Sequence, residues 1–276
     1  MNRTLLTTLL LTTGCFDFGD EDKDGEAGAP PFIVGGTGSD GGGDGSGDGS
    51  GDGNGGGSGG GSGQGSNADA DDDGDGFTNG EEEEAGTNPD YAYSRPYEGG
   101  YNVGFCETPP EPTGPSGTAS ITQDGTTYEW PALAMGDVPE NLTFMDQHGE
   151  MVDLYSFCGK HVMVLVSAGW CGPCRYLAEE VQDIQDEWRE EGLQIIELIT
   201  ADNYGDAPDQ AFVQAWANDY NFEDVPVLAV PGPPTSYNHV QFLFDADGYI
   251  PSVYHLNERL EVVSPDQSVH DPSNWL

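Results

Sequence analysis

Two cysteines, Cys171 and Cys174, stand between an apolar run and a helical pattern. The run covers residues 162–166, and the residues that repeat at helical spacing begin with Leu177. A thiol at the start of a helix faces backbone N–H groups and the positive end of the helix dipole, which stabilise an anion. Because the thiolate is the form of cysteine that attacks disulfides, this C-x-x-C arrangement predicts thiol–disulfide exchange.

Other chemistries of paired cysteines fit these residues less well. A haem attachment needs a histidine directly after the second cysteine, where Arg175 stands. A zinc site needs a second pair of ligands. A purely structural disulfide is the remaining alternative, although the Trp before the pair and the Gly-Pro inside it favour a functional turn. No histidine is spaced to complete a zinc site with another cysteine: His148, His161, His239, His255 and His270.

An acidic stretch offers a second candidate site, for a hard cation. Residues 71–82 fit the pattern D-x-D-x-D-G-x5-E at every specified position. Carboxylates on alternate residues can surround Ca²⁺, Gly76 permits a sharp turn, and the last glutamate can bind through both oxygens. The alternative is an acidic linker that matches because Asp and Gly are abundant here. The predicted ligands are Asp71, Asp73, Asp75, the Phe77 carbonyl, Asn79 directly or through water, and Glu82.

The composition limits the partners of the protein. Its 276 residues include 50 Asp and Glu but only 7 Lys and Arg, which gives a formal net charge of −43. This charge argues against nucleic acid as a partner, because phosphate binding needs clustered cations. It is typical of a well-solvated exported protein, and it is compatible with divalent cations and with neutral or basic proteins.

The N-terminus predicts export. Residues 1–14 combine a positive start with an apolar run that is too short to span a bilayer. They resemble a bacterial lipoprotein signal peptide, in which Cys15 becomes the lipidated residue. Thr12 departs from that pattern, so an ordinary secretory signal with an incidental cysteine is the alternative. The expected location is the bacterial cell envelope, with a lipid anchor in the outer membrane and the protein on its periplasmic or surface face.

The composition also divides the rest of the chain. Residues 15–66 are a Gly/Ser/Asp-rich tether, which we expect to be disordered. Residues 67–91 hold the acidic calcium-binding-like motif, and 92–134 form a Pro/Gly-rich segment that we expect to lie as irregular chain on the domain surface. Residues 135–276 carry the apolar patterns that a folded domain needs.

Turn and periodicity signals predict an α/β fold. We expect three hairpins, each around a turn signal: within residues 121–130, within residues 136–154 with the turn at 148–149, and within residues 242–250. Buried strands and helices alternate between the second and third hairpins: strands 162–167, 195–200 and 225–230, with a helix from the C-x-x-C to Gly192 and a second helix over 208–220. This order implies a mixed central sheet flanked by helices.

Trp170, Cys171, Gly172, Pro173 and Cys174 form the active-site pentapeptide of thioredoxins. With a preceding Gly-Asp-Val-Pro-Glu-Asn segment and a later Phe-Leu-Phe-Asp-Ala-Asp-Gly segment, about residues 135–260 resemble the redoxin branch of the thioredoxin-like superfamily. That branch holds the TlpA- and ResA-like exported thiol–disulfide oxidoreductases. The resemblance implies that Cys171 is the attacking thiolate, that Cys174 resolves the mixed disulfide, and that the other three residues shape the loop.

The same resemblance implies the partners. The redox chemistry would need no cofactor, the substrates would be protein thiols or disulfides, and an upstream electron donor would restore the dithiol. The acidic stretch and its continuation to Pro89 resemble the calcium repeats of thrombospondin type 3.

Some positions depart from the family patterns. Cytosolic thioredoxins carry a buried Asp as proton acceptor six residues before the first cysteine, where this chain has Leu165. The cis-proline of the family falls in register on His239, with Pro234 and Pro226 as nearby candidates. Peroxiredoxins have Thr or Ser three residues before their reactive cysteine, and Ala168 stands there, which argues against peroxide reduction.

The remaining cysteines predict a second disulfide, and the Gly-Pro dipeptide indicates the direction of the redox reaction. Cys106 and Cys158 are an even pair in an oxidising compartment, which predicts a structural disulfide. The Gly-Pro of the motif is that of reducing thioredoxins. The sequence therefore predicts an extracytoplasmic, membrane-tethered thiol–disulfide oxidoreductase that reduces protein disulfides. The alternatives are a non-catalytic calcium-binding surface lipoprotein with a vestigial thioredoxin fold, and a copper-handling thioredoxin-like protein that uses His239.

Overall fold

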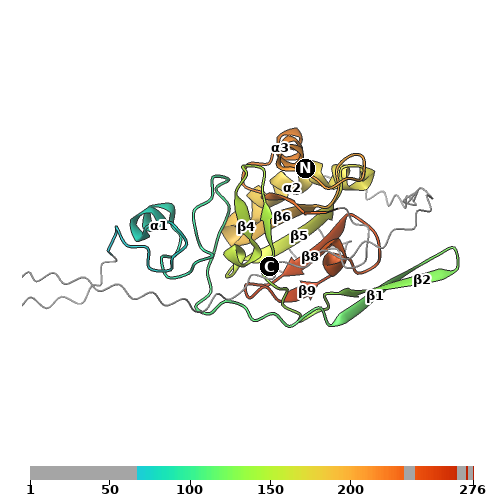
Figure 1. The fold of residues 1–276 in the computed structure, drawn as a ribbon, viewed down its shortest axis with the longest axis horizontal. Helices are drawn as coiled ribbons and strands as arrows, with labels where there is room; N and C mark the ends of the chain where they lie inside the picture. Colours follow the sequence, from blue (N-terminus) through green and yellow to red (C-terminus); the bar gives the residue numbers. More distant parts are fainter. Residues whose placement is uncertain (1–66, 233–239, 266–271, 273–275) are drawn as a thin grey trace, which may run out of the picture. The chain divides into compact units, whose positions relative to one another are not determined.

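A mixed sheet forms the centre of the folded region. The computed structural model describes residues 67–232, 240–265, 272 and 276, which belong to the unit formed by residues 65–276. The strands are β3 (Thr143–Met145), β4 (Met151–Asp153), β5 (His161–Ser167), β6 (Leu193–Ile199), β7 (Val227–Ala229), β8 (Ser252–Leu256) and β9 (Val262–Ser264). Their order in the sheet is β4-β3-β7-β6-β5-β8-β9 (Figure 1). The predicted signal peptide, Cys15, the tether, Pro234 and His239 lie outside the described residues.

Helices connect the parallel strands, as parallel pairing requires. Strand β5 pairs with β6, and β6 with β7, both in parallel, while β3, β8 and β9 join the sheet antiparallel. Helix α2 (Gly172–Trp188) leads from β5 to β6, and α3 (Gln210–Asp219) leads from β6 to β7. A short 3₁₀ turn, η2 (Arg189–Glu191), extends α2 to Gly192, whose left-handed φ of 94° ends the helix. The predicted alternation of strands and helices is confirmed.

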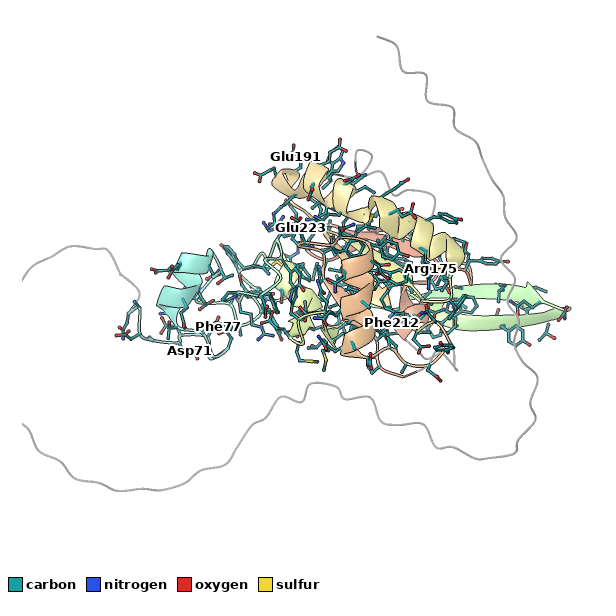
Figure 2. All side chains as sticks on the ribbon, turned by 90° about the horizontal axis from the view of Figure 1, so that it is seen from above. Asp71, Phe77, Arg175, Glu191, Phe212 and Glu223 are labelled. Carbon is teal, nitrogen blue, oxygen red and sulfur yellow. A yellow bond between two sulfur atoms is a disulfide. The ribbon has the colours of Figure 1, made fainter. Side chains whose placement is uncertain are left out.

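Helices α2 and α3 cover one face of the sheet. Met163 and Leu165 of β5 pack there against Val181 of α2, and Ile199 of β6 packs against Val213 of α3. Figure 2 shows α2 with Arg175 near one end and Glu191 beyond the other, and α3 carrying Phe212.

The Pro/Gly-rich segment contributes to the core on the other face. The rings of Tyr91, Tyr97 and Tyr101 are buried in the same cluster as Val164 of β5. The hydroxyl of Tyr91 donates to the carbonyl oxygen of Tyr155 at 3.3 Å, and the 3₁₀ turn η1 (Leu154–Phe157) is itself buried. Part of this segment is therefore core-forming chain, although it has no regular secondary structure before β1.

Two of the three predicted hairpins are confirmed. Strands β1 (Gly117–Gln123) and β2 (Thr126–Ala132) pair antiparallel around Asp124 and Gly125, which both adopt positive φ as a tight hairpin turn requires. Strands β3 and β4 pair as the second hairpin. Trp130 in β2 is 1% exposed, and its indole N–H donates to the Asp245 carbonyl oxygen at 2.9 Å.

The third predicted hairpin is wrong. Residues Val240–Phe244 form the 3₁₀ turn η3, and the antiparallel pair at this end of the chain is β8 with β9. The Phe242 ring packs against that of Trp130 in a tilted arrangement, with centroids 5.4 Å apart, so this apolar triplet contacts the β1–β2 hairpin. Asp245 then accepts the backbone N–H groups of Asp247 and Gly248 and closes a turn that leads into β8.

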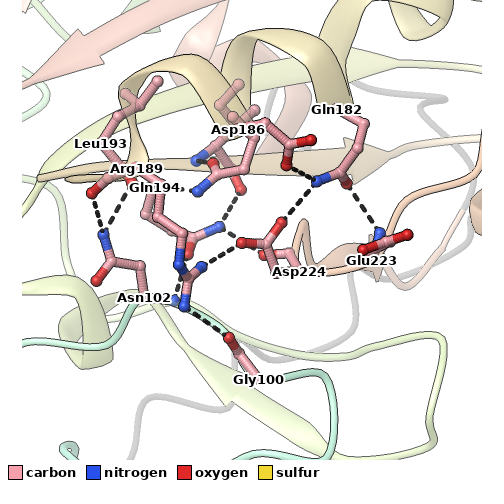
Figure 3. A network of polar contacts seen from close by, with 11 residues as sticks. Gly100, Asn102, Gln182, Asp186, Arg189, Leu193, Gln194, Glu223 and Asp224 are labelled. Atoms are coloured by element: carbon pink, nitrogen blue, oxygen red, sulfur yellow. Dashed lines mark hydrogen bonds and ion pairs between the residues drawn. The ribbon is translucent and has the colours of Figure 1, made fainter. Parts of the chain in front are cut away.

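A polar network fixes the Pro/Gly-rich segment to the start of β6 (Figure 3). The side-chain amide of Asn102 donates to the Leu193 carbonyl oxygen at 3.0 Å, and its backbone N–H donates to Gln194 Oε1 at 2.6 Å. Arg189 donates to the Gly100 carbonyl oxygen and forms an ion pair with Asp224. The parallel strands begin at this end of the sheet, so the network lies opposite the end where β5 leads into the C-x-x-C.

This topology is the predicted α/β, thioredoxin-like fold. The parallel core β5-β6-β7 carries the helices of one face, and the antiparallel strand β8 lies beside β5. Within the described ranges, none of the helices has the length and apolar character to cross a membrane.

Candidate active site

The two cysteines of the C-x-x-C lie where β5 gives way to α2. Cys171 is the N-cap residue of α2, and the backbone N–H of Cys174 donates to the Cys171 sulfur at 3.2 Å. The two sulfurs are bonded in a disulfide, with Cα atoms 5.3 Å apart. The helix therefore begins at the Cys171 sulfur, a position where unsatisfied N–H groups and the helix dipole stabilise negative charge. Pro173 occupies the first turn, where the lack of an N–H costs nothing.

The two sulfurs differ little in exposure in this oxidised form. Cys171 is 3% exposed and Cys174 is fully buried, and both pack against Ala168 and Ala201. The exposed surface around them belongs to Trp170, which is 42% exposed, and to the exposed residues Gly172 and Pro173.

Arg175 holds the loop that precedes the motif. Its guanidinium donates from Nε to the Gly169 carbonyl oxygen at 2.9 Å and from Nη2 to Asn203 Oδ1 at 2.6 Å. Gly169 must be glycine, because a Cβ there would lie 2.6 Å from the ring of Phe212 and 2.7 Å from the backbone of Asp202. The residue after the second cysteine thus fixes the backbone two residues before the first.

The cis-proline beside the cysteines is Pro251. The Ile250–Pro251 bond is cis, and the Ile250 carbonyl oxygen lies 3.6 Å from Cys171 Sγ. Pro226, one of the predicted positions, is not among the cis bonds, and the other two, Pro234 and His239, lie outside the described residues. The expected position was wrong because it was counted back from the 242–248 segment, which is not the strand. An Ile-Pro directly before the apolar segment Ser252–Leu256 was the available signal.

A buried carboxyl group lies under this site. Glu197 in β6 is 1% exposed and stands opposite Leu165 of β5 in the parallel register. Burial raises its pKa to about 7, and the Ser167 hydroxyl and the Trp216 indole N–H oppose part of that rise. Trp216 donates from Nε1 to Glu197 Oε2 at 3.0 Å. Sequence reasoning missed this residue, although a single glutamate in an otherwise apolar strand was visible.

The acidic stretch forms a compact loop ahead of α1 (Asn79–Ala85). One carboxylate oxygen from each of Asp71, Asp73 and Asp75 lies within 4.8 Å of the other two. Each of these side chains also caps the loop: Asp71 accepts the N–H groups of Gly74 and Gly76, Asp73 that of Asp75, and Asp75 that of Phe77. Figure 2 shows Asp71 and Phe77 on this loop.

The buried oxygens of this loop have the chemistry that a cation needs. Glu82 is fully buried, and neither of its carboxylate oxygens has a hydrogen-bond partner; the same holds for Oδ2 of Asp73 and of Asp75. Burial raises the Glu82 pKa to about 7, and the charges of Asp73 and Asp75 add to this. Unpaired buried carboxylates are costly unless a cation or a proton neutralises them. Asn79 instead holds the loop, since its amide donates to Asp72 Oδ2 at 2.7 Å.

Comparison with known proteins finds two family models. Residues 135–274 match the model of the AhpC/TSA family, and residues 71–89 match that of the bacterial TSP3 repeat. No curated protein matches the chain.

Several solved structures are similar to the folded domain. The thioredoxin domain of a thiol-disulfide oxidoreductase from Bacteroides vulgatus is 20% identical, with 48% of this chain and 88% of that chain covered and a TM-score of 0.38. A thiol:disulfide interchange protein of Chlorobium tepidum is 17% identical, with 49% and 89% covered and a TM-score of 0.37. A secreted disulfide oxidoreductase of Mycobacterium tuberculosis is 14% identical, with 44% and 80% covered and a TM-score of 0.35.

Proposed function

The chain belongs to the AhpC/TSA family and is a thioredoxin-like oxidoreductase, and from this premise we propose that it reduces protein disulfides outside the cytoplasm. The observation that carries the proposal is the Cys171–Cys174 pair at the N-terminus of α2, close enough to close a disulfide. Ala168, three residues before Cys171, offers no hydroxyl for peroxide, which favours disulfide exchange over peroxide reduction.

The exchange runs in two steps. The Cys171 thiolate attacks one sulfur of a substrate disulfide, and the substrate S–S bond breaks as the Cys171–substrate bond forms. The first substrate thiolate leaves and takes a proton from solvent. Cys174 then loses its proton and attacks Cys171 Sγ, which releases the second substrate thiolate and closes the Cys171–Cys174 bond. Two electrons have passed to the substrate, and a dithiol of an upstream donor protein must return them.

We further propose that the protein is tethered to the cell envelope by a lipid on Cys15. The support is the signal-like sequence of residues 1–14 and the pairing of Cys106 with Cys158, since a structural disulfide is typical of oxidising compartments. The tether of residues 15–66 would let the redox domain reach protein substrates near the membrane.

The test of the redox function is to trap its intermediate. With Cys174→Ser, the mixed disulfide on Cys171 cannot be resolved, so substrate proteins should stay covalently attached and be recovered from cells under non-reducing conditions. The matched control is the double variant Cys171→Ser/Cys174→Ser, which should trap nothing. Equal recovery from both variants would overturn the proposal.

We also propose that the acidic loop binds Ca²⁺ through Asp71, Asp73, Asp75 and Glu82. The support is the set of buried, unpaired carboxylate oxygens on these side chains. When bound, the cation would neutralise this cluster and hold the loop against the start of α1. A single loop of this kind is expected to bind at about 10⁻⁴–10⁻³ M, the range of extracellular calcium modules.

Calcium binding should depend on Glu82 and on pH. Glu82→Gln is expected to weaken Ca²⁺ binding to the full chain at least about tenfold, because it removes a charged bidentate ligand. Since the Glu82 pKa is about 7 without the cation, a proton must leave for Ca²⁺ to bind, and the affinity should fall about tenfold from pH 8 to pH 6. Calorimetry measures both effects. Glu84→Gln, an exposed change on the same helix, is the control, and equal weakening by both variants would contradict a specific site.

A further inference from the structure

The resolving cysteine must lose its proton before it can attack the mixed disulfide. Cys174 is fully buried, and the apolar residues that pack with it and Cys171 are Ala168, Ala201 and Ile250. Burial in apolar surroundings raises the pKa of a thiol, so the attacking thiolate forms slowly unless a nearby group accepts the proton. In β5, the residue that faces α2 two positions before Ser167 is Leu165, which cannot accept a proton.

Two other buried carboxyl groups in the described ranges, Asp137 and Asp146, already accept several hydrogen bonds that hold the local structure. Asp137 accepts the backbone N–H groups of Ser116 and Ala134, and hydrogen bonds of this kind hold its pKa below the usual value despite its burial. Asp146 accepts the Tyr101 hydroxyl at 2.6 Å and two backbone N–H groups. Asp137 is thus stabilised as an anion, and the carboxylate oxygens of Asp146 are already occupied by donors of its own surroundings.

Two further buried carboxyl groups lie away from Cys174. Asp245 lies near Tyr254, whose ring packs on the face of the sheet opposite α2. Glu82 belongs to the acidic loop. Among the buried carboxyl groups of the described ranges, Glu197 therefore remains as the candidate on the helix-covered face of the central strands.

The strand register places Glu197 below the cysteine pair. Glu197 pairs with Leu165. Two residues further along β6, on the same face, Ile199 pairs with Ser167. Ser167 directly precedes Ala168, on which Cys174 packs. The next helical turn after Cys174 brings Ala178 down beside Ile199 and Trp216. The Glu197 carboxyl group therefore lies on the helix-covered face of β6, against Trp216 of α3 and one residue pair inward from the end of β5 that leads to the cysteines.

A chain of contacts ties this carboxyl group to the active-site loop. The indole N–H of Trp216 donates to Glu197 Oε2 at 3.0 Å. The guanidinium of Arg175 lies over the Trp216 ring, 5.9 Å from its centroid, and donates to the carbonyl oxygen of Gly169. The neutral donors Ser167 and Trp216 offset only part of the cost of burying a carboxylate, so the pKa of Glu197 stays raised to about 7, the range that suits a general base.

We propose that Glu197 accepts the proton that Cys174 loses when it attacks the mixed disulfide. This inference rests on the proposed function and assigns a role within it. The proton moves from Cys174 Sγ to the Glu197 carboxylate, the Cys174 thiolate attacks Cys171 Sγ, and the substrate thiolate leaves. When the upstream donor later reduces the disulfide, the proton returns from Glu197 to Cys174, so the carboxyl group is unchanged after a full cycle.

The test separates the two cysteines by following their reaction with Ellman's reagent. The reduced full chain, with Cys15, Cys106 and Cys158 each changed to serine so that the C-x-x-C supplies the reacting thiols, releases one thionitrobenzoate when Cys171 attacks. It releases a second one when Cys174 displaces the reagent from Cys171. Stopped-flow absorbance resolves the two phases between pH 5 and pH 9. The first phase reports the proposed function, and the second reports the inference about Glu197.

Glu197→Gln keeps the size of the side chain and an oxygen for the Trp216 N–H. At pH 7 it is expected to slow the second phase at least about tenfold, since a positioned base contributes about 10²–10⁴ to such transfers. The first phase should stay within about twofold. The step near pH 7 in the second phase should disappear, and the rate should recover only at higher pH, where solvent hydroxide ionises the thiol.

Glu187→Gln, an exposed charge removal on α2, is the matched control and should leave both phases unchanged. A second phase in Glu197→Gln with the wild-type rate and pH profile would overturn the assignment of Glu197 while leaving the proposed function intact. The absence of a first phase in the wild-type protein would instead overturn the proposed function itself.

Discussion

Replacing Cys171 with serine is expected to reduce insulin-disulfide reduction to the uncatalysed rate, about 10³-fold or more below wild type. The reason is that in the proposed mechanism Cys171, at the start of α2, forms the mixed disulfide, and removing a nucleophile generally removes the catalysed path. The measurement is insulin precipitation with dithiothreitol as the electron donor.

The matched control for Cys171→Ser is the double variant Cys106→Ser/Cys158→Ser. It also removes a cysteine pair but leaves the C-x-x-C intact, so at a temperature where it is folded it should keep most of the activity. Activity of Cys171→Ser within about tenfold of wild type would contradict the assignment of Cys171 as the attacking thiol.

The strand, the C-x-x-C and the helix were predictable because their signals are local. A run of apolar residues of strand length, then Pro173 near the start of a 3.6-residue period, specifies β5 and α2 without any knowledge of the rest of the fold. The β1–β2 hairpin was predictable for the same reason, since Asp124 and Gly125 tolerate the positive φ that its turn needs.

The end of the sheet was not predictable in this way. Phe242 and Phe244 alternate as strand residues do, but Phe242 packs against Trp130, which comes more than 100 residues earlier in the chain. The segment forms a 3₁₀ turn where this contact is made, and the strand at this end of the chain is Ser252–Leu256 instead. A local pattern cannot show which distant partner an apolar side chain will meet, and the error in the strand carried over to the position of the cis-proline.

The second layer of the site was also missed, for a different physical reason. Glu197 lies in the fully buried strand β6, where a carboxylate is unfavourable unless its proton or a donor compensates for the burial. The prediction described residues 195–200 as a buried strand and gave no role to Glu197, the one acidic residue in it. A residue that violates its local pattern is a better indicator of function than one that obeys it.

The Pro/Gly-rich segment shows how irregular chain can be structural. Tyr97 and Tyr101 lie in the core although no periodicity marks them, because glycines and prolines around them let the backbone follow the domain surface. Tyr97 shares a 2.8 Å hydrogen bond with the Ser156 hydroxyl. Within the segment, Cys106 forms a disulfide with Cys158, which lies 52 residues further along the chain.

Breaking the Cys106–Cys158 disulfide is expected to lower the free energy of unfolding by about 4 kcal/mol. In the chain-entropy model the bond restricts the unfolded chain, and a closed loop of this length corresponds to about that value at 25 °C. The bond also keeps Gly104 in place, whose backbone N–H donates to the Ser156 carbonyl oxygen at 2.9 Å. Urea unfolding of each form, fitted with its own slope because the cross-link also limits how far the unfolded chain expands, measures the change in free energy.

The measurement is cleanest in a Cys171→Ser/Cys174→Ser background, where the oxidised and reduced forms of one chain differ by the Cys106–Cys158 bond. The noncovalent contacts of the segment, such as those of Asn102 with the start of β6, are the same in both forms. If the reduced form is less stable by under about 1 kcal/mol, those contacts alone hold the segment on the sheet, and the disulfide is not its main restraint. A loss near the expected value would mean instead that the covalent bond between Cys106 and Cys158 secures part of the core on the face opposite α2.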